Sequence, residues 1–94
     1  MKSINISEKL RYDEKPVLEI GESVTIEVNN KAIDLLEAAE LADGDITKAQ
    51  IDRLLTLLYS EEDREKLLSL DLSIHDFLTV ITESISAVVG GGKN

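Results

Sequence analysis

The sequence LLSLDLSIHDFLTVITESISAVV, residues 67–89, contains the longest apolar-periodic run in the chain. Ser73 is followed three residues later by Asp76, which is the spacing of a capping box at a helix N-terminus. Beyond Ser73, apolar residues recur at steps of three and four: Ile74, Phe77, Leu78, Ile81, Ile85, Val88 and Val89. This pattern predicts a helix of roughly four to five turns with one broad apolar stripe. Gly90 is expected to end the helix in the left-handed conformation.

The size and composition of the chain predict one small globular domain, residues 1–94, with an aliphatic core. The chain has 94 residues, of which 43% are hydrophobic and only three are aromatic: Tyr12, Tyr59 and Phe77. A domain of this length can bury a single thin core, with little stability to spare. The remaining elements must therefore supply the surface on which the apolar stripe packs.

The charge and the absence of cysteine exclude several classes of function. The formal net charge is −9, which repels nucleic-acid phosphates and anionic membrane surfaces, so we expect neither as a partner. Without cysteine the chain has no disulfides, thiolate metal sites or cysteine nucleophiles, which fits a cytoplasmic protein. The first residues lack the apolar segment of a signal peptide, and no apolar run has the length of a membrane span.

The N-terminal third is predicted to contain an irregular arm and a β-hairpin. In the arm, residues 1–16, either Ser7 caps a short turn, or Ile4, Ile6 and Leu10 lie extended over the core. Residues 17–28 are predicted to form a hairpin whose second arm, residues 23–28, alternates strictly between polar and apolar side chains, with Gly21 and Glu22 as a two-residue turn. A lone hairpin is marginal in water, so its apolar face is expected to lie on the helices.

Residues 31–89 are predicted to be helical, and residues 90–94 to form a flexible tail. The expected helices run from about 31 to 41, from 45 or 47 to about 59, from 61 to about 70, and from 74 to 89. Ser60 with Asp63 makes a second capping box, at the start of the third of them. In the first of them, capped by Asn29 or Asn30, the apolar period is marked by Ile33, Leu36 and Ala39 or Glu40. The predicted fold class is α+β, mainly α, with the N-terminal hairpin packed on a compact bundle of about four helices.

No constellation of residues supports catalysis, a cofactor or a metal, and we expect no enzymatic activity. His75 is the only histidine and lies off the apolar stripe, at the start of the last helix. Residues 43–45 read Asp-Gly-Asp, but a calcium loop centred on Gly44 would lack carboxylates at its first and last ligand positions. Ser73 lacks the directly preceding aspartate of an acyl carrier protein and is better explained as a helix cap.

Binding through apolar surface is the remaining possibility. Leucines nearly encircle the helix that contains residues 54–58, and the apolar stripe of the last helix continues to its end. These residues are either all core, or core with an exposed interface that also supports self-association. The candidate partner-binding residues are Leu57, Leu58, Ile81, Ile85, Val88 and Val89.

The order of these features resembles a known family. An arm with EKL and DEKP is followed by a hairpin ending in VNN and by an acidic helical half. That half contains LLYSEEDREKLLSLDLSIHDFLTVI, residues 57–81. The sequence is similar to the tail assembly chaperones of long-tailed phages and prophages of Gram-positive bacteria. The similarity covers most of the chain and consists of leucine and capping patterns, so it transfers no catalytic residue.

The resemblance implies a non-enzymatic role in the host cytoplasm. Members of that family keep the long tape measure protein soluble and help to recruit the major tail protein before the tail tube forms. The alternative is a small acidic regulatory or inhibitor protein that binds one basic partner through its charge.

Overall fold

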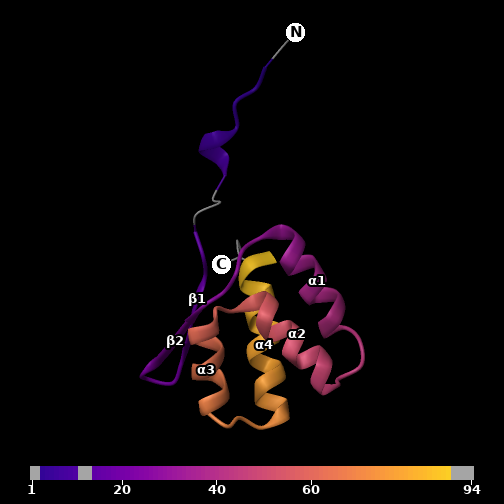
Figure 1. Ribbon diagram of the computed structural model, residues 1–94. Coiled ribbons are helices and arrows are strands. Elements are labelled where there is room, and N and C mark those ends of the chain that lie inside the picture. The colour runs from indigo at the N-terminus through magenta and orange to yellow at the C-terminus, as the bar shows by residue number, and fades with distance from the viewer. Residues whose placement is uncertain (1–2, 11–13, 90–94) are drawn as a thin grey trace.

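The computed structural model describes residues 3–10 and 14–89, which form an α+β fold that is mainly helical (Figure 1). The described elements are the 3-10 turn η1 (Ser7–Lys9), the strands β1 (Val17–Ile20) and β2 (Val24–Glu27), and the helices α1 (Ala32–Ala42), α2 (Lys48–Leu58), α3 (Glu61–Ser69) and α4 (Ile74–Val89). The predicted fold class, an N-terminal hairpin and about four helices, is confirmed. The helix-ending role of Gly90 and the tail 90–94 lie outside the described residues.

The hairpin alternates as its sequence predicts. Leu18 pairs with Ile26 and Ile20 pairs with Val24 across the antiparallel ladder. Ile26 is buried in the core and the other three side chains pack against it, because residues two apart on a strand share one face. The apolar face of the hairpin therefore covers the helices, as a two-stranded sheet requires.

The connection between the strands differs from the prediction. Because Ile20 pairs with Val24, the loop contains three residues, Gly21, Glu22 and Ser23, and the predicted two-residue turn is wrong. Gly21 has a φ of 70°, a conformation that glycine adopts without a side-chain penalty.

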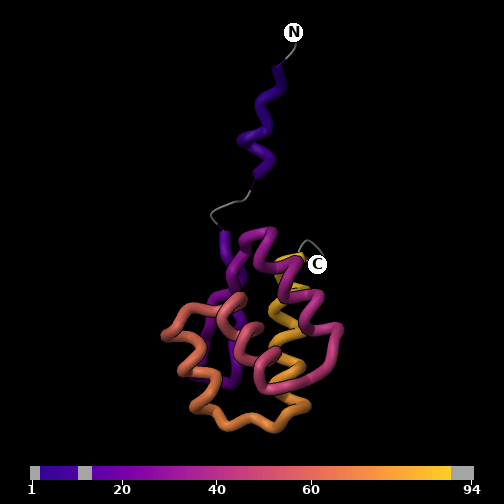
Figure 2. The backbone as a smooth tube through the Cα atoms, turned by 45° about the vertical axis from the view of Figure 1, so that its right-hand side comes forward, coloured from indigo at the N-terminus to yellow at the C-terminus, as the bar shows by residue number. Residues whose placement is uncertain are grey.

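The α2 helix occupies the centre of the bundle and packs against α1, α3 and α4 (Figures 1 and 2). Its four leucines at 54, 55, 57 and 58 are all buried. Around them lie core residues from every other helix and from the hairpin: Ile26, Val28, Leu35, Ala38, Tyr59, Leu67 and Ile81. Full burial of one such leucine or isoleucine side chain is worth about 1.5–3 kcal/mol, so this cluster is the main source of stability.

Three of the four helices in the described chain begin at a side-chain cap. The hydroxyl oxygens of Thr47, Ser60 and Ser73 each accept a hydrogen bond from the backbone N–H three residues later, at 3.1–3.2 Å. Each bond satisfies one of the free N–H groups at a helix start and is worth about 1 kcal/mol. The predicted starts of α3 at Ser60 and α4 at Ser73 are confirmed, and of the two starts predicted for α2, Asp45 and Thr47, the structure has Thr47.

The start of α1 is built differently from the prediction. The N-cap residue is Lys31, and its side chain makes no capping bond. The Asn29 side chain instead accepts from the Lys31 N–H at 2.9 Å, and its amide donates to Asp34 and to the Leu57 carbonyl, each at 2.8 Å. Asn29 thus joins the end of β2, the first turn of α1 and the last turn of α2.

The α1 helix is also rotated relative to the prediction. Its buried residues are Leu35 and Ala38, whereas Ile33 and Leu36, which were expected to mark the core period, are exposed. The helix sequence AIDLLEAAELA has apolar residues on nearly every side, so two phases at three- and four-residue spacing are available. In the structure, the set that contains Leu35 and Ala38 faces the core, where α1 packs against α2. The small side chain of Ala38 suits such a contact between helices.

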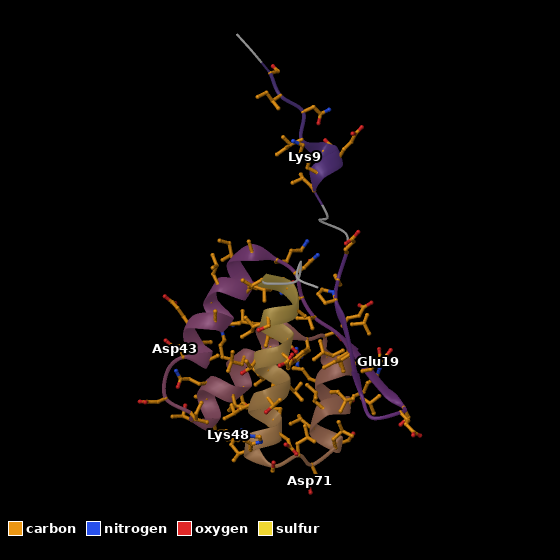
Figure 3. All side chains as sticks on the ribbon, turned by 180° about the vertical axis from the view of Figure 1, so that it is seen from behind. Lys9, Glu19, Asp43, Lys48 and Asp71 are labelled. Carbon is orange, nitrogen blue, oxygen red and sulfur yellow. The ribbon has the colours of Figure 1, made fainter. Side chains whose placement is uncertain are left out.

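The N-terminal arm does not lie over the core. The 3-10 turn η1 buries no residue and has no side-chain cap from Ser7, since its N-cap residue is Ile6. Ile4, Ile6 and Leu10 are exposed, and the arm extends away from the helical body (Figure 1). Figure 3 shows Lys9 on this arm, well separated from the helices. The predicted alternative in which these apolar residues cover the core is therefore wrong.

Candidate partner-binding surface

The six predicted partner-binding residues do not form one surface. Leu57, Leu58 and Ile81 are buried core residues, so a partner cannot contact them while the fold is intact. Ile85 and Val88 are partly buried and pack against that core, whereas Val89 is 67% exposed at the end of α4. Of the six, Val89 and the outer part of Ile85 face a possible partner, and their role in binding stays a prediction.

A second exposed apolar surface lies beside Val89, on α1. Ile33 is 75% exposed and Leu36 is 64% exposed. These residues are three apart on one helix face, and α1 packs directly against α4. We call the exposed surface formed by Ile33, Leu36 and Ala39 of α1 with Ile85 and Val89 of α4 the α1–α4 face.

A groove between the two helices runs along this face. It has a volume of about 510 Å³ and is lined by Leu36, Ala39, Glu40, Ala42, Asp43, Thr82, Ile85 and Ser86. Ile33 lies one turn before Leu36, and Val89 lies one turn after Ile85, so both extend the apolar lining at the same end. The groove thus combines aliphatic side chains with two carboxylates, Glu40 and Asp43.

Sequence reasoning missed the α1 half of this face because it assigned Ile33 and Leu36 to the core. The available signal was the second apolar set on the same helix, Leu35 and Ala38 with Leu41 and Ala42. Two competing apolar faces on one helix indicate that one of them stays outside the core.

The polar side of α1 is tied to α2 by an ion pair. Arg53 donates from Nε and from an Nη to the two carboxylate oxygens of Glu37, at 3.0 and 3.2 Å. The hydrogen bond and the charge of Glu37 raise the pKa of Arg53 further above its ordinary value. Glu37 is thus engaged by Arg53, and the acidic groups that line the groove are Glu40 and Asp43.

Residues that were considered for catalysis or metal binding are not brought together. His75 is exposed, and its Nδ1 lies 3.4 Å from the carboxylate of the adjacent Asp76. Ser73 serves as the cap of α4. Asp43 caps the end of α1, and in the described ranges no group of three or more histidine or acidic side chains is placed to hold a metal ion.

Tyr59 and Ser84 form the one fully enclosed polar contact between side chains in the described part of the chain. The Tyr59 hydroxyl lies 2.6 Å from Ser84 Oγ, and Ser84 Oγ donates to the Val80 carbonyl at 2.8 Å. Because Ser84 has a single hydroxyl hydrogen, the Tyr59 hydroxyl donates to Ser84. Burial raises the pKa of Tyr59 to about 12, so its hydroxyl stays protonated at neutral pH and holds α4 to the end of α2.

No protein-family model, curated protein or solved structure significantly matches this chain. Across residues 3–10 and 14–89, no helix combines the length and the apolar character that crossing a membrane requires.

Proposed function

We propose that this protein is a non-catalytic tail assembly chaperone of a long-tailed phage or prophage. In the host cytoplasm it binds the tape measure protein, keeps it soluble and helps to recruit the major tail protein. The observation that carries the proposal is the exposed apolar α1–α4 face on a strongly acidic body. The resemblance of residues 57–81 to that family supplies the identity of the partners.

The shape of the α1–α4 face suits a helical client. Two packed helices with a groove of about 510 Å³ between them can accept the apolar stripe of a third helix. Leu36 and Ile85 line the groove, and Ile33 and Val89 extend it at one end. A tape measure protein presents long helical apolar segments, which would otherwise associate with one another.

The charge of the body suits both binding and solubility. Residues 17–94 contain 16 acidic and 6 basic side chains, so a complex that covers the apolar face stays strongly charged. Glu40 and Asp43 lie in the groove itself and favour a client helix with lysine or arginine beside its apolar stripe.

Co-expression of the chain with a helical fragment of the tape measure protein tests this proposal. The wild-type chain should retain the fragment in the supernatant and capture it in a pull-down. Leu36→Glu should abolish capture, because it places a charge in the apolar groove. Leu68→Glu is the matched control, since Leu68 is also a helical leucine, 61% exposed, but lies on α3 outside the face.

The outcome also separates this proposal from the acidic-inhibitor alternative. Equal capture by Leu36→Glu and Leu68→Glu would contradict binding at the α1–α4 face. If capture were in addition lost at about 0.5 M salt, the body charge would carry the binding, as expected for an inhibitor of a basic partner.

A further inference from the structure

The two edges of the hairpin are not equivalent. On the outer edge of β2, the Glu27 N–H donates to Asp63 Oδ2 at 2.9 Å, and the Thr25 carbonyl accepts from Lys66 Nζ at 3.2 Å. In an antiparallel pair, residues alternate between bonding the partner strand and pointing outward. The backbone N–H and C=O groups of Thr25 and Glu27 point away from β1. The same backbone groups of their partners, Glu19 and Val17, therefore point away from β2, at the opposite edge of the sheet.

The edge of β1 is open. Within the described ranges, no side chain or backbone group bonds the outward N–H and C=O groups of Val17 and Glu19. The α3 helix thus closes one edge of the sheet and leaves the other free to pair with a further strand. Figure 3 shows Glu19 on this hairpin, at the side of the molecule away from α1.

The N-terminal arm has the sequence of a short strand. Residues 3–7 read Ser-Ile-Asn-Ile-Ser, a strict alternation that puts Ile4 and Ile6 on one face. Residues 3–6 precede η1, and their length of four residues equals that of β1. Ile6 is the N-cap of η1, with φ −111° and ψ 13°, so it must become extended when the strand pairs. Ile4 is 77% exposed, so two β-branched side chains suited to a sheet are left in solvent.

We propose that residues 3–6 of one copy of this chain add as a third strand to the open edge of β1 in a second copy. The register that places Ile4 and Ile6 beside Leu18 and Ile20 extends the apolar face of the sheet, since Leu18 and Ile20 are partly buried against the core. The inference concerns self-assembly and does not depend on the identity of the client.

Charge favours contact between an arm and a body, and the direction of the arm points to a second copy as the source of the strand. Residues 1–16 contain four basic and three acidic side chains, whereas residues 17–94 carry 16 acidic and 6 basic ones, so arm and body attract. The η1 turn is fixed by bonds from Lys9 N–H to the Ile6 carbonyl at 2.9 Å and from Leu10 N–H to the Ser7 carbonyl at 3.2 Å. The arm that carries this turn points away from its own hairpin (Figures 1 and 2).

Cross-linking separates exchange between copies from pairing within one chain. The chain has no native cysteine, so Asn5→Cys with Glu19→Cys introduces two thiols on the polar face of the proposed sheet. Mild oxidation of the full chain should give covalent dimers or larger species on a non-reducing gel. Monomer alone, with or without an internal disulfide, would overturn the proposal. Asn5→Cys with Asp52→Cys is the control and should give far less cross-linked product.

Sedimentation velocity on the full chain measures the contribution of the arm. Replacing Ile4 and Ile6 by lysine should weaken self-association by about a hundredfold or more, because each buried isoleucine contributes about a factor of ten or more. The matched control replaces Ile46 and Ile74 by lysine, which adds the same charge at two other exposed isoleucines. Equal weakening by both pairs, or a strictly monomeric wild-type chain at high micromolar concentration, would contradict the proposal.

Glu19→Pro tests the acceptor edge. Proline removes the outward N–H of residue 19 and spares the bonds between β1 and β2, which is the position where strands tolerate it. The variant should lose self-association, with a circular dichroism spectrum like that of the wild type. A folded variant that associates normally would overturn the assignment of the β1 edge. If the variant unfolds, concentration-dependent protection of the Glu19 amide against hydrogen exchange in the wild type replaces this test, and its absence would count equally against the proposal.

Discussion

At the scale of single residues, Tyr59 and Ser84 place a hydrogen-bonded pair of hydroxyl groups inside an otherwise aliphatic core. Both side chains are buried, and the chain of donors runs from Tyr59 through Ser84 to the Val80 carbonyl. A buried hydroxyl without an acceptor loses the bonds that it makes to water in the unfolded state. The two members of the pair should therefore differ in their response to substitution.

Ser84→Ala should lower the free energy of unfolding by about 1–3 kcal/mol, because it leaves the buried Tyr59 hydroxyl without an acceptor. Tyr59→Phe should cost less, about 0.5–1.5 kcal/mol, since Ser84 still donates to Val80. Urea unfolding measures both values, with the exposed Ser86→Ala as the control on the same helix. A larger cost for Tyr59→Phe than for Ser84→Ala would contradict this order.

Tyr59 should also make the fold sensitive to alkaline pH. Its pKa is raised from 10.0 to about 12 in the folded state by burial, so the unfolded chain releases the proton first as the pH rises. The contribution of Tyr59 to the free energy of unfolding is fully present below pH 10. As the pH rises from about 10 to 12, the free energy of unfolding falls by about 2–3 kcal/mol. Urea unfolding should find the wild type more stable than Tyr59→Phe below pH 10 and less stable near pH 12, because this loss exceeds the roughly 0.5–1.5 kcal/mol that separates them at neutral pH. A difference that stays constant across this range would show that Tyr59 does not titrate this way.

At the scale of elements, Asp63 joins the hairpin to the helices. Its backbone N–H donates to the Ser60 cap, as the sequence spacing predicts. Its carboxylate does not return to Ser60, as in a full capping box, but accepts from the Glu27 N–H on β2 and lies 3.4 Å from Lys66 Nζ. One acidic residue in the first turn of α3 therefore gives a hydrogen-bond acceptor to the outward backbone N–H of Glu27, at the edge of β2.

Asp63→Ala should lower the free energy of unfolding by about 1–3 kcal/mol, because it leaves the half-buried Glu27 N–H without an acceptor. Glu62→Ala is the control, since Glu62 lies in the same helix turn and is exposed. Hydrogen exchange of the Glu27 amide should accelerate in Asp63→Ala and stay unchanged in Glu62→Ala. Equal effects of both variants would assign the role to charge at the helix N-terminus instead.

At the scale of the whole molecule, one core serves every helix and the hairpin. Ile81 of α4 is 1% exposed, and the core that it joins draws on residues from 26 to 81. A single core of this size should unfold in one cooperative transition.

Ile81→Ala should lower the free energy of unfolding by about 2–5 kcal/mol, through lost burial and the cavity that remains. Val89→Ala removes apolar atoms from an exposed site on the same helix and should change the value by less than about 0.5 kcal/mol. Thermal unfolding by circular dichroism compares the two variants. An unchanged melting temperature for Ile81→Ala would place this position outside the core.

Several parts of the fold follow from local chemistry and were predictable from the sequence. The caps at Ser60 and Ser73 are contacts between residues three apart, so their spacing in the chain determines them. The alternation in β2 likewise fixes the buried face of the hairpin, because successive strand residues point to opposite sides. The class of fold follows from these elements and their order.

The candidate binding surface was only partly predictable. Val89 was identified because the stripe of α4 runs on beyond the core. The α1 half was not, because α1 is apolar on nearly every side and periodicity alone offers two phases.

The sequence by itself therefore determined which segments become helix or strand and where α3 and α4 begin. Tertiary structure alone decided three further features: the rotation of α1 that exposes Ile33 and Leu36, the burial of Ser84 against Tyr59, and the contact of Asp63 with β2. The physical reason is the range of the interactions. Caps and strand alternation act between neighbours in the chain, whereas the rotation of a helix and the partner of a buried polar group depend on residues about 20 or more positions away.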